Sequence, residues 1–169
     1  MHKHEETIWD VVVIGGGASG MMTAGRAGSL GKKILLLEKN DELGKKLLIT
    51  GGGRCNVTNA EQDLRTLLSK FKDSDKFLFS AFSQFSNKDT LDFFNSRGME
   101  TKVEANNRVF PISNKSQSVW NVLLEYLKTN NVTVQSNCTV VDIETDGDKI
   151  TSVKLKDKTV IKAKSFVLS

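Results

Sequence analysis

The order of apolar and polar residues predicts alternating strands and a helix at the start of the chain. Residues 8–14 are almost entirely apolar and β-branched, which is typical of a strand buried on both faces of a parallel sheet. A helical pattern follows over residues 18–30, and Gly31 is placed to end that helix. A second apolar run, KILLLE, occupies residues 33–38. Together these segments predict a βαβ unit.

The middle of the chain reads as helical. Apolar residues recur at helical spacing within residues 60–71, 75–85 and 87–98. Asn87 is a candidate N-cap for the last of these helices, and Gly98 is a candidate stop. The segment 75–85 carries a stripe of phenylalanines, which we expect to lie in the core: Phe77, Phe79, Phe82 and Phe85.

The remaining pattern predicts further strands around one long helix. Residues 99–113 read as two short strands around an ANN turn, and residues 113–131 as a helix with a broad apolar face. VTVQ at 132–135 would be a third parallel strand. From Cys138 onward apolar and polar residues alternate, which predicts an antiparallel meander whose last segment, 162–169, enters the final parallel strand.

A glycine motif lies between the first strand and the first helix. Gly15, Gly17 and Gly20 form G-x-G-x-x-G. In this motif the first glycine permits the tight turn, the second lets a phosphate approach the backbone, and the third lets the helix pack closely on the sheet. The helix N-terminus attracts a pyrophosphate, and Glu38 stands where an acid accepts hydrogen bonds from a ribose diol. These features predict a dinucleotide site, and the acid disfavours a 2′-phosphate.

A second glycine run, LLITGGGRCNVTN at residues 47–59, favours FAD over a nicotinamide dinucleotide. Consecutive glycines can adopt positive φ and direct successive N–H groups toward an anion or a carbonyl oxygen. Arg54 adds a permanent cation, and short polar side chains follow it. Cys55 is either a neighbour of the flavin ring or a small buried residue without chemistry. Because FAD is long, we expect both glycine turns to line the same cofactor.

Composition narrows the function classes. The net charge is +4, but the lysines are spread along the chain and paired with acids, so we expect no nucleic-acid partner. Two cysteines without a CxxC pattern, and His2 and His4 near the start, give no reason to expect a metal site. No apolar run is long enough to span a membrane and none resembles a secretory signal, which predicts a cytoplasmic protein. No catalytic acid–base pair or nucleophilic triad is evident.

Three segments carry a resemblance to a known family: VVVIGGGASGMMTA, then LLEKNDELGKKLLITGGGRCNVTN, then NRVFP. Together they resemble the HI0933-like, or aminoacetone-oxidase-like, bacterial flavoproteins, over essentially the whole chain. The resemblance implies an α/β Rossmann-like FAD/NAD(P)-binding domain of the glutathione-reductase type, with a parallel sheet, extra helices and an antiparallel β-meander. It also implies that residues 1–169 are the N-terminal part of the FAD-binding domain, without the inserted second domain and the C-terminal FAD segment of the family.

The motifs and the resemblance together give the candidate cofactor-binding residues. Those assigned to the ADP half are Gly15, Gly17, Ala18, Ser19, Gly20, Glu38 and Lys39, with Val140 expected near the adenine by resemblance. Those assigned to the pyrophosphate and flavin are Lys45, Thr50, Gly51, Gly52, Gly53, Arg54, Cys55, Asn56, Thr58 and Asn59. Arg108 is either a residue on the substrate side or a surface arginine. No catalytic residue is assigned.

The sequence therefore predicts the FAD-binding portion of a flavin-dependent oxidoreductase. We expect a small-molecule substrate of unknown identity, NAD(P)H as a candidate electron donor, and no membrane partner. Two alternatives remain: an NAD(P)-binding module of a dehydrogenase, and a non-catalytic basic protein that binds RNA.

Overall fold

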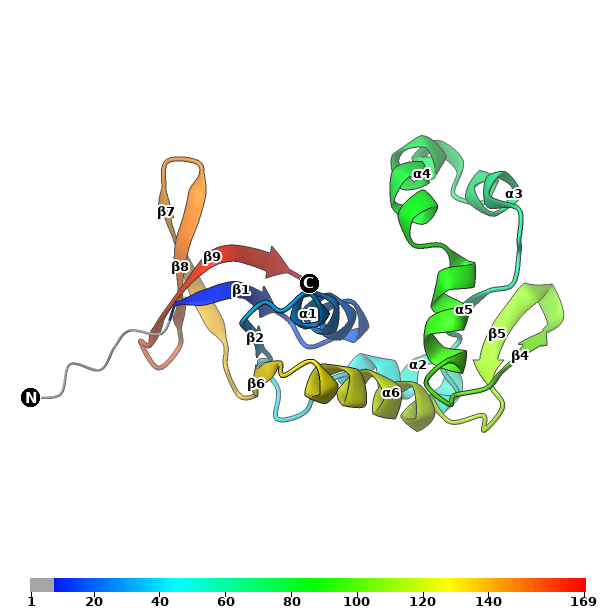
Figure 1. The fold of residues 1–169 in the computed structure, drawn as a ribbon, viewed down its shortest axis with the longest axis horizontal. Coiled ribbons are helices and arrows are strands. Elements are labelled where there is room, and N and C mark those ends of the chain that lie inside the picture. Colours follow the sequence, from blue (N-terminus) through cyan, green and yellow to red (C-terminus); the bar gives the residue numbers. More distant parts are fainter. Residues whose placement is uncertain (1–7) are drawn as a thin grey trace, which may run out of the picture. The chain divides into compact units, whose positions relative to one another are not determined.

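The computed structural model describes residues 8–169, so His2 and His4 lie outside the described residues. The chain forms two compact units (Figure 1). The first comprises the residues up to Lys46 together with Leu123–Ser169, and the second comprises Leu47–Val122. Two helices cross the boundary between these ranges along the chain, α2 (Lys45–Gly53) and α6 (Ser116–Thr129).

The first unit is built on a sheet with the order β6-β2-β1-β9-β8-β7 among the described residues. Its strands are β1 (Trp9–Ile14), β2 (Ile34–Leu37), β6 (Thr133–Gln135), β7 (Val140–Asp146), β8 (Lys149–Leu155) and β9 (Val160–Leu168). Strands β6, β2, β1 and β9 are parallel, whereas β7, β8 and β9 form the antiparallel meander. Strand β9 therefore belongs to both arrangements, as the sequence predicts.

The helix α1 (Ala18–Ser29) connects β1 to β2 and completes the βαβ unit. All four residues of β2 are buried, which explains its continuous apolar sequence. Helix α1 buries Met21 and Ala24 fully. Gly31 follows the end of α1 and adopts a left-handed backbone conformation with φ 72°, as predicted for a residue that terminates a helix.

The second unit combines helices with a small antiparallel sheet. Its helices are α3 (Leu64–Ser69), α4 (Asp75–Gln84) and α5 (Asn87–Asn95), and its sheet has the order β3-β5-β4. The strands are β3 (Thr58–Asn59), β4 (Thr101–Glu104) and β5 (Arg108–Pro111), with a left-handed Asn106 at φ 61° in the predicted ANN turn. Its buried apolar residues include Leu67, Leu68, Phe93, Phe94, Val109 and Phe110.

Two expectations for the second unit are wrong. The phenylalanine stripe of α4 is not core, because α4 has no buried residue and the Phe77 side chain is 85% exposed. The cap of α5 is Ser86 rather than Asn87, because Ser86 and Asp89 form a reciprocal capping box. Asn87 is instead a buried first helical residue, whose side-chain amide donates to backbone oxygens of Asn59 and Glu61.

Candidate functional site

The glycine turn of the first unit, Gly15 to Gly17, leads directly into the N-terminus of α1. The Gly15 N–H donates to the Leu37 carbonyl at 2.8 Å, which joins the turn to the end of β2. Gly17 caps α1 without any side-chain hydrogen bond to the first helical turn. A Cβ built on Gly17 would have no heavy atom within 4 Å. Gly17, Ala18 and Ser19 are all exposed, so this end of α1 is accessible, as an anion site at a helix N-terminus requires.

The other glycines of this turn are packed rather than open. A Cβ at Gly20 would lie 1.9 Å from the Gly15 carbonyl oxygen, and a Cβ at Gly15 would lie 2.3 Å from the Ser169 carbonyl oxygen. Gly15 also has φ 107°, a value that side-chain-bearing residues rarely adopt. The structure thus agrees with the turn role predicted for Gly15 and with the close-packing role predicted for Gly20.

Glu38 is a buried acid held by three donors. Its side chain accepts hydrogen bonds from the Gly16 N–H at 2.7 Å, the Asn40 N–H at 2.8 Å and the Asn40 side-chain amide at 2.6 Å. A buried carboxylate is stable only when donors of this kind surround it. The bond to Gly16 brings the acid at the end of β2 against the glycine turn.

The other candidates of the first unit lie near this turn, on the surface or, for Val140, beside the core. Ser19 is exposed and its hydroxyl oxygen lies 2.5 Å from that of Ser169. Lys39 is exposed, and Lys45 forms an exposed ion pair with Asp41 that raises the pKa of the lysine. Val140 packs at the edge of the core cluster formed by β1, β2, β8 and β9.

The triple-glycine run of the second unit forms a left-handed turn at the end of a short helix. The sequence did not predict that helix, which begins at Lys45. Thr50 leaves the helix at ψ 149°, and Gly51, Gly52 and Gly53 follow at φ 57°, 65° and 83°. Hydrogen bonds from the Arg54 and Cys55 N–H groups to the Gly51 and Thr50 carbonyls close the turn. The predicted positive φ values are confirmed.

Arg54 is held by side chains of its own unit. Its guanidinium forms an ion pair with Glu104 and donates to the Asn114 side-chain oxygen from Nε at 3.2 Å and from Nη2 at 2.8 Å. The guanidinium also lies over the Phe110 ring, 4.2 Å from its centroid. The hydrogen bonds of Glu104 with Arg54 and with Lys102 lower the pKa of the Glu104 carboxyl.

Several polar candidates in this segment bind the local backbone. The Asn56 side-chain oxygen accepts from the Val109 N–H at 3.3 Å, and the Asn59 oxygen accepts from the Glu61 N–H at 2.9 Å. Thr58 pairs with Val109 in the small sheet. Cys55 is buried, and burial raises the pKa of its thiol, while its contact with a flavin ring stays a prediction.

Comparison with known proteins identifies the family. The model of the HI0933-like protein Rossmann domain matches residues 9–169. The chain belongs to the HI0933-like family.

Curated relatives of this HI0933-like chain are enzymes with different substrates in their names. It is 30% identical over 138 residues to the ribosomal RNA dihydrouridine synthase of Escherichia coli, covering 82% of this chain and 34% of that protein. It is 36% identical over 131 residues to the 3-dehydro-bile acid delta(4,6)-reductase of Clostridium scindens, covering 76% of this chain and 31% of that protein. The chain therefore spans about a third of the length of these relatives.

Solved structures share the fold of the HI0933-like chain. A flavocytochrome c3 fumarate reductase has a TM-score of 0.74 at 21% identity, over 97% of this chain and 33% of that one. The 3-ketosteroid-delta4-(5alpha)-dehydrogenase of Rhodococcus jostii has a TM-score of 0.71 at 14% identity, over 99% of this chain and 47% of that one. The α/β Rossmann-type fold expected from the motifs is confirmed.

The structure also identifies supporting residues that the sequence analysis missed: Asn40, Glu104 and Asn114. No periodicity or motif points to them, because each acts only through a side-chain contact with Glu38 or Arg54 that the linear sequence does not show. Arg108 is exposed, donates to the Ala105 carbonyl at 3.1 Å and lies 5.8 Å from the Phe110 centroid, and its place on the substrate side stays a prediction.

Residues 8–169 also bear on metal binding and on membrane insertion. This part of the chain contains no cluster of three or more histidine, cysteine or acidic residues suited to a metal ion. Within the same residues, every helix is too short or too polar to cross a bilayer.

Proposed function

We propose that this chain is the FAD-binding portion of a flavin-dependent oxidoreductase. The observation that carries the proposal is the hydrogen bond from the Gly16 N–H to the buried Glu38 carboxylate. It holds the acid beside the glycine turn and the N-terminus of α1. That combination offers acceptors to a ribose diol and N–H donors to a pyrophosphate.

The residues of the first unit fit the ADP half of this cofactor. A side chain is absent at Gly17, whose Cβ position meets open space, and Glu38 keeps one lone-pair position, on Oε2, beyond the three donors that it already accepts. The remaining candidates, Ala18, Ser19, Lys39 and Val140, are proposed to line the phosphates, ribose and adenine. A 2′-phosphate next to Glu38 would meet like charge, so NADP is disfavoured at this turn.

The left-handed turn of the second unit is proposed to bind the flavin portion. A Cβ at Gly52 or Gly53 would meet nothing within 4 Å, so the backbone there is accessible to a ligand. The proposed contact set is Lys45, Thr50, Gly51, Gly52, Gly53, Arg54, Cys55, Asn56, Thr58 and Asn59. Within this set, Asn56 and Asn59 already hold backbone groups, so their contribution is to fix the shape of the turn.

The reaction is proposed from the names of the curated relatives. A dihydrouridine synthase and a delta(4,6)-reductase both saturate a carbon–carbon double bond. FAD supplies two-electron redox chemistry when bound, and the protein binds and orients it. We infer that the intact protein reduces a double bond conjugated to a carbonyl group, with NAD(P)H as electron donor. A cytoplasmic location is part of the same proposal.

Cofactor titration tests the binding function. Purified intact protein is titrated with FAD, NAD and NADP, and thermal unfolding and flavin fluorescence are followed. We expect FAD to raise the unfolding temperature the most and to bind with an altered flavin spectrum. Stabilisation by NAD alone would favour the alternative of a nicotinamide-binding module, and no response to FAD would contradict the proposal.

Reoxidation of the reduced flavin by candidate substrates tests the reaction class. The reduced, FAD-loaded protein is mixed without oxygen with uridine-containing ribosomal RNA or with a 3-oxo steroid that carries conjugated double bonds. Reoxidation of the flavin by one of these compounds identifies the substrate class. The expectation that no nucleic acid is a partner stays a prediction, and reoxidation by RNA would contradict it.

A further inference from the structure

The contacts around Arg54 form one connected group within the second unit. Glu104, at the end of β4, pairs with the guanidinium, and Asn114, beyond the end of β5, accepts from two of its nitrogens. Asn114 is itself fixed, because it adopts φ 53° and its N–H donates to the Pro111 carbonyl at 3.0 Å. The orientation of the guanidinium is therefore determined by two separate segments of the chain.

The Phe110 ring lies close to both the Arg54 guanidinium and the glycine turn. The ring is 3% exposed and lies under the guanidinium at 4.2 Å from its carbon. A Cβ built on Gly51 would lie 3.5 Å from the Cε1 atom of the same ring. Since one buried ring contacts the guanidinium and lies beside Gly51, it places the guanidinium next to the left-handed turn.

One edge of the guanidinium is left without a protein partner among the described residues. The bonds to Asn114 and Glu104 use Nε and Nη2, so Nη1 keeps its N–H groups for another acceptor. The side chain is 37% exposed, which leaves this edge accessible. Lys102 also contacts Glu104 at 3.1 Å, so one carboxylate here faces two cations. The excess positive charge favours an electron-rich ligand.

We propose that Glu104 and Asn114 are positioning residues for Arg54, and that the guanidinium they hold offers its Nη1 edge to a carbonyl oxygen of the flavin ring of the bound FAD. The inference rests on the proposed function, because it assigns a role within the same cofactor site. This role is more specific than that of a cation alone. Because Glu104, Asn114 and Phe110 fix the guanidinium plane, its N–H groups point in a defined direction in addition to carrying positive charge.

The test compares FAD affinity and flavin reduction potential in variants of the intact protein. The variants are Arg54→Ala, Arg54→Lys, Glu104→Ala, Glu104→Gln, Asn114→Ala and the Arg54→Ala/Glu104→Ala double variant. Glu100→Ala and Lys115→Ala are matched controls, because both residues are exposed, charged and close in the chain to Glu104 and Asn114. Circular dichroism and thermal unfolding confirm that each protein is folded.

We expect Arg54→Ala to raise the Kd for FAD about tenfold or more, because a charge-assisted hydrogen bond is lost. Lysine at position 54 should not restore affinity, since an ammonium group cannot reproduce the fork. Glu104→Ala and Asn114→Ala should weaken FAD binding in the same direction, whereas Glu104→Gln keeps an acceptor and should recover most of the affinity. The controls should stay within about twofold of the wild-type Kd.

Two further measurements separate positioning from general stability. If Glu104 acts through Arg54, the double variant should bind FAD no more weakly than Arg54→Ala alone. Removal of the guanidinium should also make the flavin reduction potential more negative, because a donor to the electron-rich reduced ring is lost.

The outcomes distinguish the two proposals. Wild-type affinity and potential in Glu104→Ala and Asn114→Ala would overturn the positioning role while leaving FAD binding intact. Losses that multiply in the double variant would overturn it too, because the residues would then act independently. Failure of the wild-type protein to bind FAD would overturn the proposed function and this inference with it.

Discussion

Two glycines of the same motif have different residue-scale roles, and alanine substitution separates them. We expect Gly20→Ala to lower the free energy of unfolding by about 3 kcal/mol, because its Cβ would lie 1.9 Å from a backbone oxygen. Gly17→Ala should change that free energy by less than about 1 kcal/mol, since its Cβ meets open space. However, it should raise the Kd for FAD at least about tenfold by blocking the approach of a phosphate.

Urea denaturation and FAD titration measure these two effects in the intact protein. Gly52→Ala is an informative companion, because Gly52 also has open space around it but has φ 65°. We expect it to cost about 1–2 kcal/mol of stability from the backbone conformation alone. Unchanged FAD affinity in both Gly17→Ala and Gly52→Ala would contradict the assignment of the two turns.

Glu38 gives a second residue-scale prediction. Glu38→Gln places an NH₂ group where the carboxylate accepts N–H donors from both sides, so we expect a loss of about 1–2 kcal/mol. Glu38→Ala should cost about 2–3 kcal/mol, because buried donors then lack an acceptor. Glu42→Gln, at an exposed acid in the following loop, is the control and should have almost no effect on chemical denaturation.

At the scale of single elements, helix α5 depends on its capping box. We expect Ser86→Ala to lower the free energy of unfolding by about 1 kcal/mol, because the Asp89 N–H loses its side-chain acceptor. Ser83→Ala, on the exposed surface of α4, is the matched control. Equal stability of the two variants in thermal denaturation would argue against the cap.

The same box predicts a direction for pH dependence. Hydrogen bonds from Ser86 lower the pKa of Asp89 below its ordinary value of 3.8. The contribution of a depressed carboxyl pKa is present above the unfolded-state pKa and is lost as the pH falls through the folded-state value. The difference in stability between wild type and Asp89→Asn should therefore shrink below about pH 4, as measured by urea denaturation at several pH values.

Elements with a strong local signal were predictable, and those that depend on distant contacts were not. Strands β1 and β2 and helix α1 could be predicted because a buried strand, a glycine turn and a periodic helix each leave a pattern in consecutive residues. The helical start of α2 was missed, since the following glycines dominate the local composition. The roles of Glu104 and Asn114 could not be predicted, because they arise from contacts with Arg54 across 50 and 60 residues.

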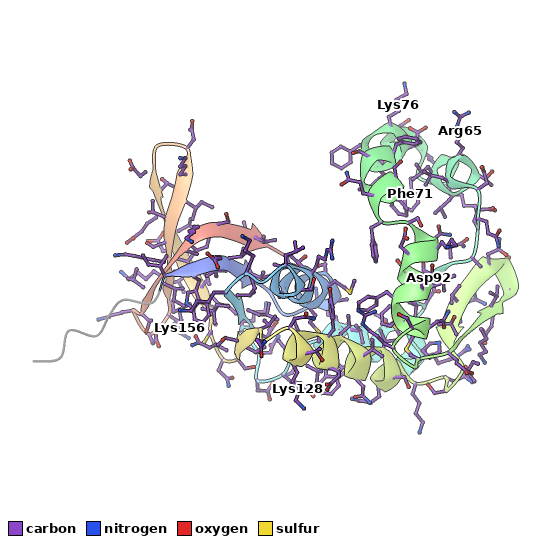
Figure 2. The ribbon with its side chains drawn as sticks, in the orientation of Figure 1. Arg65, Phe71, Lys76, Asp92, Lys128 and Lys156 are labelled. Carbon is purple, nitrogen blue, oxygen red and sulfur yellow. The ribbon has the colours of Figure 1, made fainter. Side chains whose placement is uncertain are left out.

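At the scale of the whole molecule, apolar side chains are divided unevenly between interior and surface. Phe93 and Phe94 on α5 are buried, whereas Phe71, Phe77, Phe79 and Phe85 are exposed around α4. Figure 2 shows the side chains of Arg65 and Lys76 extending outward from the same pair of helices, α3 and α4. The periodic stripe alone could not reveal this, because helical spacing shows that residues share a face and not what covers that face.

This distribution predicts opposite effects of two phenylalanine substitutions. Phe94→Ala should cost about 3–5 kcal/mol, since it leaves a cavity at a side chain that is 5% exposed. Phe77→Ser should change the free energy of unfolding by less than about 0.5 kcal/mol, because that side chain is already in water. A large destabilisation by Phe77→Ser would show that the ring is covered in solution.

The pairing of β1 with β9 has a mechanical consequence. These strands run in parallel, with Trp9 opposite Ala163 and Ile14 opposite Leu168, so the entry to β1 and the exit from β9 lie at opposite ends of one ladder. Tension applied between Ile8 and Ser169 would shear every rung of that ladder together instead of unzipping the rungs in turn. Stretching single molecules from these two points should therefore meet high resistance, and pulling the β7–β8 hairpin apart from its open end, at Val140 and Leu155, should meet little.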